Sequence, residues 1–522
     1  LGSRIFGFAR ETLMAAALGT GPMADVFYAA FRFPNLFRRL FAEGAFNAAF
    51  VPLFAKEIEA HGIEGAKRFS EEVFGVLFSV LLLITIVMEL SMPLLVRWVI
   101  APGFADDAEK FDLTVRLAAV MFPYLMSMSL TAMMSGMLNS LHHFFAAAVA
   151  PIFLNLVMIS ALFYAIYFGA DPLTTAWYLS WSVLVAGVLQ LAVVYIGVRH
   201  AGINIGLRFP RFTPNVKRLL LLAIPAAITG GVTQINLVIG QAIASGKEGA
   251  IAALQYADRI YQLPLGVVGV AVGIVLLPEL ARSLKSGHIK EAANIQNRSI
   301  EFVLFLTLPA AVALWLLSDD IIRVLYERGA FNSENTKLVG SILAIFGLGL
   351  PAFVLIKALQ PGFYAREDTK SPMRYTAVAV AVNSALSILL FPVLAERGIA
   401  VAEAVAGWLN AVQLFVTLYR RGHLVWEWSL ARRTAMLLVS CAVMGGVIVY
   451  LSDRWEPLLG SGSTLLTKTG VLGLLILIAM AVYFIVAFLI GGVDLGMVRR
   501  NLKRKRAGTA SDAKAVNGES GG

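Results

Sequence analysis

Charged side chains gather in one long apolar stretch of this sequence, Asp25–Pro52, where a helix facing only lipid would carry none. The charged residues of the stretch are Asp25, Arg32, Arg38, Arg39 and Glu43. Each charge at the centre of a membrane helix costs roughly 2.5–3.5 kcal/mol on insertion scales. The planar guanidinium group of arginine pairs well with phosphate. The first interpretation is therefore a water-filled cavity that binds an anion.

Two other apolar stretches carry similar charges. The first holds Arg4, Arg10 and Glu11, and a later one holds Asp258 and Arg259. Arg4 is close enough to the chain start to extend to a membrane interface. Arg10 lies about ten residues into its apolar run, so we favour a cavity role for Arg10 more strongly than for Arg4. Across the three stretches arginines outnumber acids, and this excess favours a multiply charged anion.

Some of these charges have a simpler structural interpretation. Arg39 and Glu43 are four residues apart, so on a helix they can neutralise each other. The adjacent Asp258 and Arg259 can do the same. Arg38 has no local partner of this kind, which makes it the strongest candidate for contact with the anion.

Uncharged polar residues also occur in apolar runs. Gln234, Asn236 and Asn383 form a candidate cation site, although hydrogen bonds between helices explain them equally well. Asp25 is a candidate structural counter-ion. The six histidines and the single cysteine lack the spacing of metal ligands, so we predict no metal site and no enzymatic activity.

Composition decides the class of protein. The chain has 522 residues, of which 58% are hydrophobic and 15% charged. Its mean hydropathy is +0.77. Soluble domains carry about 25% charged residues, so this is a polytopic, all-α membrane protein. The net charge of +10 is spread over short loops and one tail, which argues against nucleic acid as a partner.

Fourteen apolar runs are long enough to be spans, which need about 20 residues. They lie near residues 1–19, 24–55, 69–100, 111–141, 144–169, 174–199, 216–245, 249–284, 299–318, 336–365, 373–395, 398–419, 431–451 and 465–491. Basic loops follow the second, sixth, eighth and twelfth runs, and the tail begins RRNLKRKR. If every run spans, these basic segments share one side, so we predict that this side and both termini are cytoplasmic.

The sequence also repeats itself. Gly19 and Gly246 each lie 13 residues before an arginine, Arg32 and Arg259, and further matches keep offsets of 226 to 228 residues. Six spans per half is an even number, so both halves enter from the same side, as in carriers with parallel repeats. We predict four regions: an N-lobe at 1–200 with a shortened first helix, a C-lobe at 214–423, two further helices at 424–495, and a basic, then disordered, tail at 496–522.

Five segments of the chain form a distinctive set: SRIFGFAR at Ser3–Arg10, ADVFYAAFRFPNLFRRLFAEGAFNAAFVP at Ala24–Pro52, APGF at Ala101–Phe104, YADRIYQLPLGVVGVAVGIVLLPEL at Tyr256–Leu280 and QPGFYAREDTKSP at Gln360–Pro372. These segments resemble the MurJ (MviN) family of the multidrug/oligosaccharidyl-lipid/polysaccharide exporter superfamily. The similarity covers nearly the whole chain apart from the tail. Members of the family are lipid II flippases of the bacterial inner membrane, required for peptidoglycan synthesis and so for cell wall biogenesis and cell shape.

The resemblance implies two lobes around a cationic cavity, and a last pair of helices that forms a groove for the lipid tail. The functional arginines of the family match Arg4, Arg10, Arg38 and Arg259. The family often has Asp after the second of these, where this chain has Glu11. Some members carry a sodium-site Asp in the seventh helix, where this chain has Gln234 and Asn236 and no acid.

The resulting hypothesis is a monomeric flippase in the bacterial inner membrane. It would move lipid II from the inner to the outer leaflet by alternating access, without a cofactor, driven by membrane potential or a monovalent cation. Its partners would be lipid II, membrane lipids and the peptidoglycan synthesis machinery. The alternatives are a flippase for another lipid-linked oligosaccharide, a drug/cation antiporter, which would want an acidic cavity, and a prenyl-phosphate transferase, which would want cytoplasmic metal-binding acids.

Overall fold

The computed structural model describes residues 2–40, 46–206, 208–425, 427–460 and 462–491. Within these ranges, the side chains of residues 2, 37–40, 48, 225–230, 232–233 and 270–275 lie outside the description. Every regular element of the described chain is a helix, as the sequence predicts.

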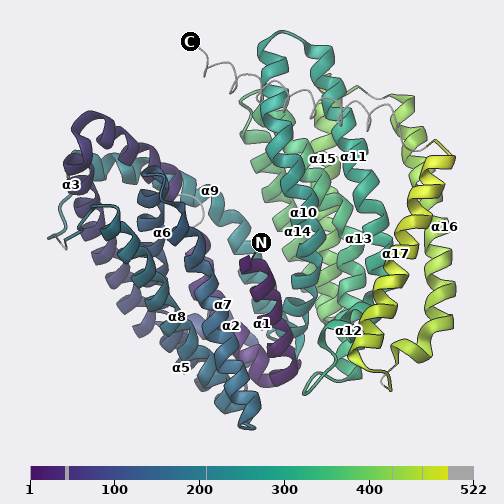
Figure 1. Ribbon diagram of the computed structural model, residues 1–522, viewed down its shortest axis with the longest axis horizontal. Coiled ribbons are helices and arrows are strands. Elements are labelled where there is room, and N and C mark those ends of the chain that lie inside the picture. Colours follow the sequence, from purple (N-terminus) through teal and green to yellow (C-terminus); the bar gives the residue numbers. More distant parts are fainter. Residues whose placement is uncertain (1, 41–45, 207, 426, 461, 492–522) are drawn as a thin grey trace, which may run out of the picture.

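The first half of the chain forms one arm of the molecule, the N-lobe (Figure 1). Its elements are α1 (Gly2–Leu18), α2 (Pro22–Leu40), α3 (Phe46–Leu90), α4 (Met92–Leu95), η2 (Val96–Ile100), η3 (Pro102–Phe104), α5 (Ala108–Met121), α6 (Tyr124–Ser140), α7 (Phe144–Tyr167) and α8 (Pro172–His200). The second arm, the C-lobe, contains α9 (Pro214–Ala244), α10 (Ala250–Lys285), α11 (Ile289–Leu316), α12 (Ser318–Tyr326), α13 (Ser333–Tyr364), α14 (Lys370–Leu394) and α15 (Glu396–Arg420). Two more helices, α16 (Trp428–Leu459) and α17 (Leu465–Leu489), follow.

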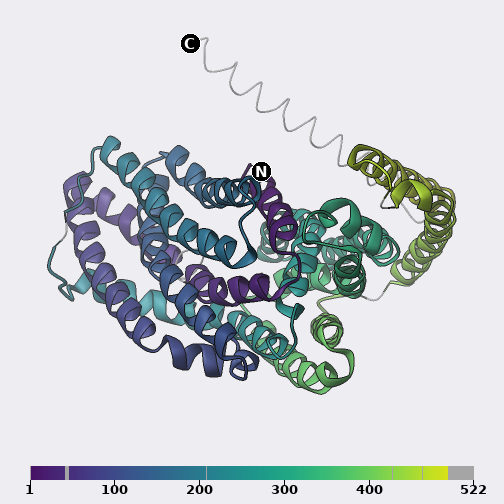
Figure 2. The same cartoon turned by 90° about the horizontal axis from the view of Figure 1, so that it is seen from below.

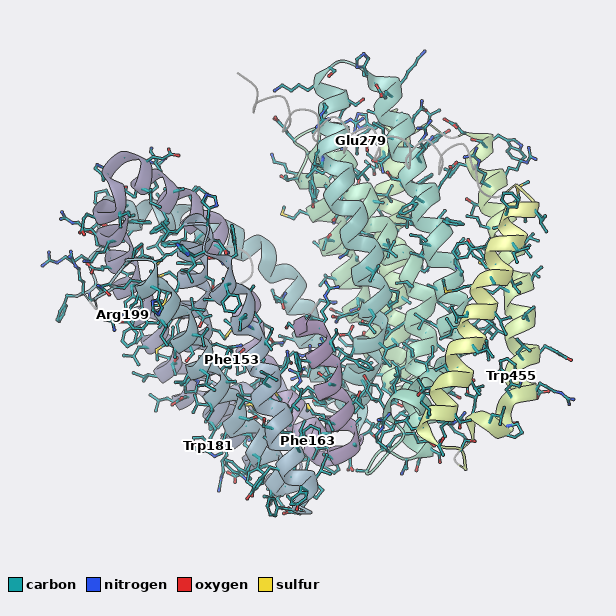
Figure 3. All side chains as sticks on the ribbon, in the orientation of Figure 1. Phe153, Phe163, Trp181, Arg199, Glu279 and Trp455 are labelled. Carbon is teal, nitrogen blue, oxygen red and sulfur yellow. The ribbon has the colours of Figure 1, made fainter. Side chains whose placement is uncertain are left out.

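The two arms meet at one end and diverge at the other (Figure 1). Figure 2 shows the lobes side by side, with α16 and α17 at the outer edge of the C-lobe. We call the diverging end the basic end, because the basic segments 56–68, 199–206, 208–218 and 282–290 belong to it, and the other the closed end. Figure 3 labels Glu279 near the basic end of α10 and Trp455 near the closed end of α16.

The order of helices repeats between the arms. The helix α7 begins at Phe144 and its counterpart α14 at Lys370, 226 residues later. The pair α5 and α6 corresponds to α13, and α8 to α15. The repeat seen in the sequence is thus a repeat of helices.

Ten helical stretches of the described residues are long and apolar enough to cross a membrane, against fourteen predicted. The first predicted run is α1, which has only 17 residues. The second run ends with α2 at Leu40, and its remainder belongs to α3, which continues past a kink at Gly62 (φ 66°). The fourth run is one of the ten stretches, Ala108–Ser140, although α5 ends at Met121 and α6 begins after Pro123, which has no N–H to donate.

The closed end is fastened by contacts between the lobes. The Asp25 carboxylate of α2 accepts hydrogen bonds from the backbone N–H groups of Gly249 (2.6 Å) and Ala252 (2.9 Å), at the N-terminus of α10. The Tyr256 hydroxyl donates to the carbonyl of Gly19 (3.0 Å). The ring of Tyr28 packs edge-on against that of Tyr256, with centroids 5.7 Å apart. Aromatic packing and one buried carboxylate therefore hold the arms together.

The helix α9 connects the arms. It packs against α3 of the N-lobe and against α14 of the C-lobe. The side chain of Gln241, near the end of α9, accepts a hydrogen bond from Arg32 (2.8 Å) and donates to the backbone carbonyl of Ile100 (3.1 Å). Both partners of Gln241 belong to the N-lobe, so its amide ties α9 to that lobe.

Candidate functional site

The helices α1 and α10, one from each lobe, cross at two glycines that make room for arginines. A Cβ atom on Gly7 of α1 would lie 2.3 Å from Nη2 of Arg259 on α10. A Cβ atom on Gly266 of α10 would lie 3.4 Å from Nη1 of Arg4 on α1. Each arginine therefore lies against the backbone of the opposite lobe. The crossing brings together Arg4 and Arg259, which are far apart in the sequence.

Arg10 is held rigidly in the same region. Its Nη2 atom lies 2.5 Å from Oε1 of Glu11, and its Nη1 atom donates to Oδ1 of Asn155 on α7 (3.1 Å). The other oxygen of Glu11 accepts from the Tyr28 hydroxyl (2.6 Å). Glu11 is thus the counter-ion of Arg10 and fixes its orientation. The side chain of Asn155 also lies near Arg259, 3.6 Å from the Cβ position of Gly7.

The crossing carries more positive than negative charge. None of the described residues forms an ion pair with Arg4 or Arg259. Asp258, expected as the neutralising neighbour of Arg259, instead accepts a hydrogen bond from Gln262. Two guanidinium groups are therefore available to an anion beside the paired Arg10.

One further cation lies near the crossing, and the sequence reasoning missed it. The Lys357 side chain of α13 is exposed and passes over Gly269 of α10, with Cδ 2.7 Å from the Cβ position of that glycine. The glycines Gly266 and Gly269 of α10 thus leave space for an arginine and a lysine. The sequence did offer one indication of this cation, because Lys357 is a single lysine within an apolar run.

The other predicted charges are distributed as follows. Asp25 caps α10 and lies 3.9 Å from the Lys110 ammonium group, so it stabilises the closed end. Arg32 donates to Gln241. The side chains of Arg38 and Arg39, and all of Glu43, lie outside the described residues, so their contacts with an anion and the Arg39–Glu43 pair stay predictions.

The candidate cation residues partly assemble. A cavity of about 670 Å³ in the C-lobe is lined by Asn236, Asn383, Glu403 and Asn410, among others. The amide of Asn383 donates to Oδ1 of Asn236 (2.8 Å), the hydrogen bond between helices that the sequence left open. Gln234 does not line this cavity, whereas Glu403, a carboxylate that the sequence reasoning missed, does.

A second concave surface lies on the outside of the C-lobe. This groove of about 850 Å³ is formed by α11 and α16, with Trp315 and Leu316 on one wall and Gly445 and Gly446 on the other. Its lining is mostly apolar, and Asp453 lies at its edge. A groove of this kind suits a hydrocarbon chain.

Two pairs of adjacent aspartates, Asp106–Asp107 and Asp319–Asp320, lie at the starts of helices. The Asp107 carboxylate accepts from the backbone N–H of Lys110 and so caps α5 (3.0 Å). Asp320 lies in the first turn of α12 and pairs with Arg323 (2.8 Å). In the described part of the chain, no group of three or more His, Cys, Asp or Glu side chains is arranged to hold a metal ion.

Comparison with known proteins assigns the family. The family model described as "Lipid II flippase MurJ" matches residues 14–470. The chain belongs to the MurJ family. A "Probable lipid II flippase MurJ" of Rhizobium tropici is 97% identical over 519 residues, which cover 99% of this chain and 97% of that protein. A MurJ relative of Rhizobium meliloti (strain 1021) is 63% identical, over 97% of this chain and 94% of its own length.

Solved structures agree on the fold. A structure described as "Lipid II flippase MurJ, inward closed conformation" superposes with a TM-score of 0.76 at 24% identity, over 96% of this chain and 97% of that one. An inward-facing MATE transporter superposes with a TM-score of 0.67 at 16% identity, over 80% of this chain and 94% of its own. The predicted all-α architecture is confirmed, and its fold is similar to those of the MurJ structure and of the MATE transporter.

Proposed function

We infer that this chain is a lipid II flippase of the bacterial inner membrane. It moves the undecaprenyl-pyrophosphate-linked precursor of peptidoglycan from the inner to the outer leaflet. Its relatives carry this name, and the observation that supports the inference in the structure is the α1–α10 crossing, where Arg4 and Arg259 have no acidic partner among the described residues. A pyrophosphate group is a multiply charged anion and fits this excess of charge.

The arginines have different roles at this site. Arg10 is fixed by Glu11 and Asn155, so it supplies a preorganised positive field. Arg4 and Arg259 come from opposite lobes, so an anion bound between them contacts both arms. We extend the proposal to Arg38 of α2, whose side chain lies outside the described residues. Transport breaks no bond, so the protein is a carrier and not an enzyme.

The movement follows from the shape of the molecule. The basic end faces the cytoplasm by the positive-inside rule. The arms diverge at that end and are fastened at the other, so this state receives substrate from the inner leaflet (Figure 1). Breaking the contacts of Asp25 and Tyr256 opens the closed end. The groove between α11 and α16 holds the polyprenyl tail outside the polar path.

The energy for transport comes from the membrane potential or from a monovalent cation. The positive site responds to the field, because moving one charge through 100 mV changes its energy by about 2.3 kcal/mol. In the C-lobe cavity, Glu403, Asn236 and Asn383 provide oxygen atoms for a monovalent cation. The protein acts as a monomer and delivers lipid II to the peptidoglycan synthesis machinery.

Transport in cells tests the function. Bacteria depleted of their own flippase would express this chain, and lipid II in the outer leaflet would be measured with a probe that cannot cross the membrane. The wild type is expected to restore outer-leaflet lipid II, and the Arg4→Ala/Arg259→Ala double variant is not. Arg116→Ala, an exposed arginine on α5, is the control. A well-expressed wild type that restores nothing would refute the substrate, and an active double variant would refute the arginine site.

A further inference from the structure

The segment that joins the two lobes carries exposed aromatic and basic side chains. We call residues 203–213 the inter-lobe strap; Leu207 within it lies outside the described residues. The strap runs from α8 to α9 without helical structure. Phe209 is 89% exposed and Phe212 62% exposed, whereas Ile203 and Ile205 are buried against the N-lobe. The strap thus has an apolar inner side and an aromatic outer side.

The inner side is fastened to α3. The carboxylate of Glu71, itself buried, lies 2.6 Å from Nε of Arg208 and accepts from the backbone N–H of Gly206 (3.2 Å). The Thr213 hydroxyl donates to Glu72 (2.9 Å). A Cβ atom on Gly75 of α3 would lie 2.3 Å from the carbonyl oxygen of Arg208. These contacts fix the backbone of the strap against α3, so Phe209 and Phe212 are held in their outward orientation.

Basic side chains surround the exposed aromatics. Arg211, Lys217 and Arg218 are exposed, and among the described residues none of them forms an ion pair. Arg208, by contrast, is neutralised by Glu71. The outer side of the strap and the first turns of α9 thus present three unpaired positive charges and two aromatic rings.

The helix α9 indicates the depth of this surface in the membrane. Leu221 and Leu222 are 74% and 51% exposed, and they lie one turn beyond Lys217 and Arg218 on the same faces of the helix. A change from exposed cations to exposed leucines within one turn marks the level at which a helix enters the hydrocarbon. Aromatic rings at that level sit among lipid headgroups. An acidic protein would match the charges but would leave the leucines without a partner.

We propose that the inter-lobe strap, with Arg211, Lys217 and Arg218, binds the headgroups of anionic phospholipids in the cytoplasmic leaflet. Phe209 and Phe212 enter the interface, and the three cations pair with lipid phosphates. Because the strap is fastened to α3 and leads directly into α9, this binding anchors the N-lobe at the basic end. The proposal rests on the proposed orientation of the basic end, but it does not depend on lipid II as the substrate.

A fluorescent label on the strap tests the proposal locally. In the full-length protein, Phe212→Cys would carry an environment-sensitive dye, since the native Cys441 is buried and reacts poorly. The protein would be placed in nanodiscs of phosphatidylcholine with and without phosphatidylglycerol. We expect phosphatidylglycerol to shift the emission to the blue, and high salt to reduce the shift because it screens surface charge.

Two charge-matched variants decide between local binding and a general charge effect. Arg211→Gln/Lys217→Gln/Arg218→Gln is expected to lose at least three quarters of the blue shift. The control neutralises three basic residues of the α10–α11 loop, Arg282, Lys285 and Lys290, and is expected to keep it. No blue shift in the labelled Phe212→Cys protein without further changes, equal loss in both variants, or full competition by soluble glycerophosphate would overturn the proposal. Lipid II transport is measured separately, so failure here leaves the flippase function untouched.

Discussion

The Asp25 carboxylate is expected to control the equilibrium between closed and open states of the closed end. It is fully buried and accepts two backbone hydrogen bonds from the N-terminus of α10, which belongs to the other lobe. The N-terminus of a helix carries partial positive charge, so a carboxylate is favoured there. When the lobes separate at this end, both N–H groups become accessible to water. Asp25 therefore stabilises the state in which the lobes are fastened, and not the separated state.

The size of the effect follows from the number of bonds lost. In Asp25→Asn a single amide oxygen replaces the two carboxylate oxygens. One of the two hydrogen bonds from α10 is therefore lost, and the acceptor of the other is no longer charged. A hydrogen bond to a charged group contributes about 1.5–3 kcal/mol. Since 1.4 kcal/mol is a factor of ten, the equilibrium should move about 10- to 100-fold toward the separated state. Lys110→Gln should have a smaller effect, because its ammonium group lies 3.9 Å from Asp25.

Distances between the lobes provide the assay. Spin labels on the two arms at the basic end, measured in the full-length protein in nanodiscs, should approach each other in Asp25→Asn as the closed end opens. Asp112→Asn is the matched control, because Asp112 forms only an exposed pair with Arg116 on α5. Unchanged distance distributions in Asp25→Asn, with the variant correctly folded, would refute the idea that this carboxylate fastens the lobes.

Three other changes have distinct expected results. Arg259→Ala should reduce the rate of transport more than tenfold. It should not lower the melting temperature, because Arg259 has no ion-pair partner among the described residues. Arg10→Ala should instead lower the melting temperature and the yield, since it leaves a buried carboxylate unpaired, a change that costs about 3–5 kcal/mol. In the loop before α14, the Ser371 hydroxyl and the Arg421 guanidinium hold the pKa of Asp368 below its usual range. This contribution to stability is present above about pH 4 and is lost as the pH falls below that. Arg421→Gln should therefore flatten the loss of thermal stability between about pH 4 and pH 2.

Hydropathy and the internal repeat predicted the helices well, because both depend on composition over many residues. They could not predict breaks that depend on single residues. The fourth apolar run is continuous in hydropathy, yet its helix ends at Met121 because Pro123 cannot donate to the preceding turn. The kink at Gly62, within a helical stretch of 45 residues, lies by contrast in the polar segment between the second and third apolar runs, where hydropathy does mark a break.

The candidate site was predictable as a set of charges but not as an arrangement. Neighbouring residues on a helix point about 100° apart, so Arg10 and Glu11 did not suggest a pair. They meet because Asn155 and Tyr28, distant in the sequence, draw the two side chains together. Arg4 and Arg259 converge because glycines on the opposite helix leave room for them. Such contacts depend on how helices cross, which the sequence of one helix does not determine.

The joint at the closed end explains why the two halves of the repeat differ where they meet. Residue 25 corresponds to residue 252 at the offset of 227, and the Asp25 carboxylate accepts a hydrogen bond from the backbone of Ala252. In a contact with approximate two-fold symmetry, a residue close to the axis lies next to its own equivalent in the other half. An acid at both positions would bring two carboxylates together in a buried space, where only one could stay ionised. The contact thus requires an acid in one half and a small residue in the other, so the repeat had to become asymmetric at this point.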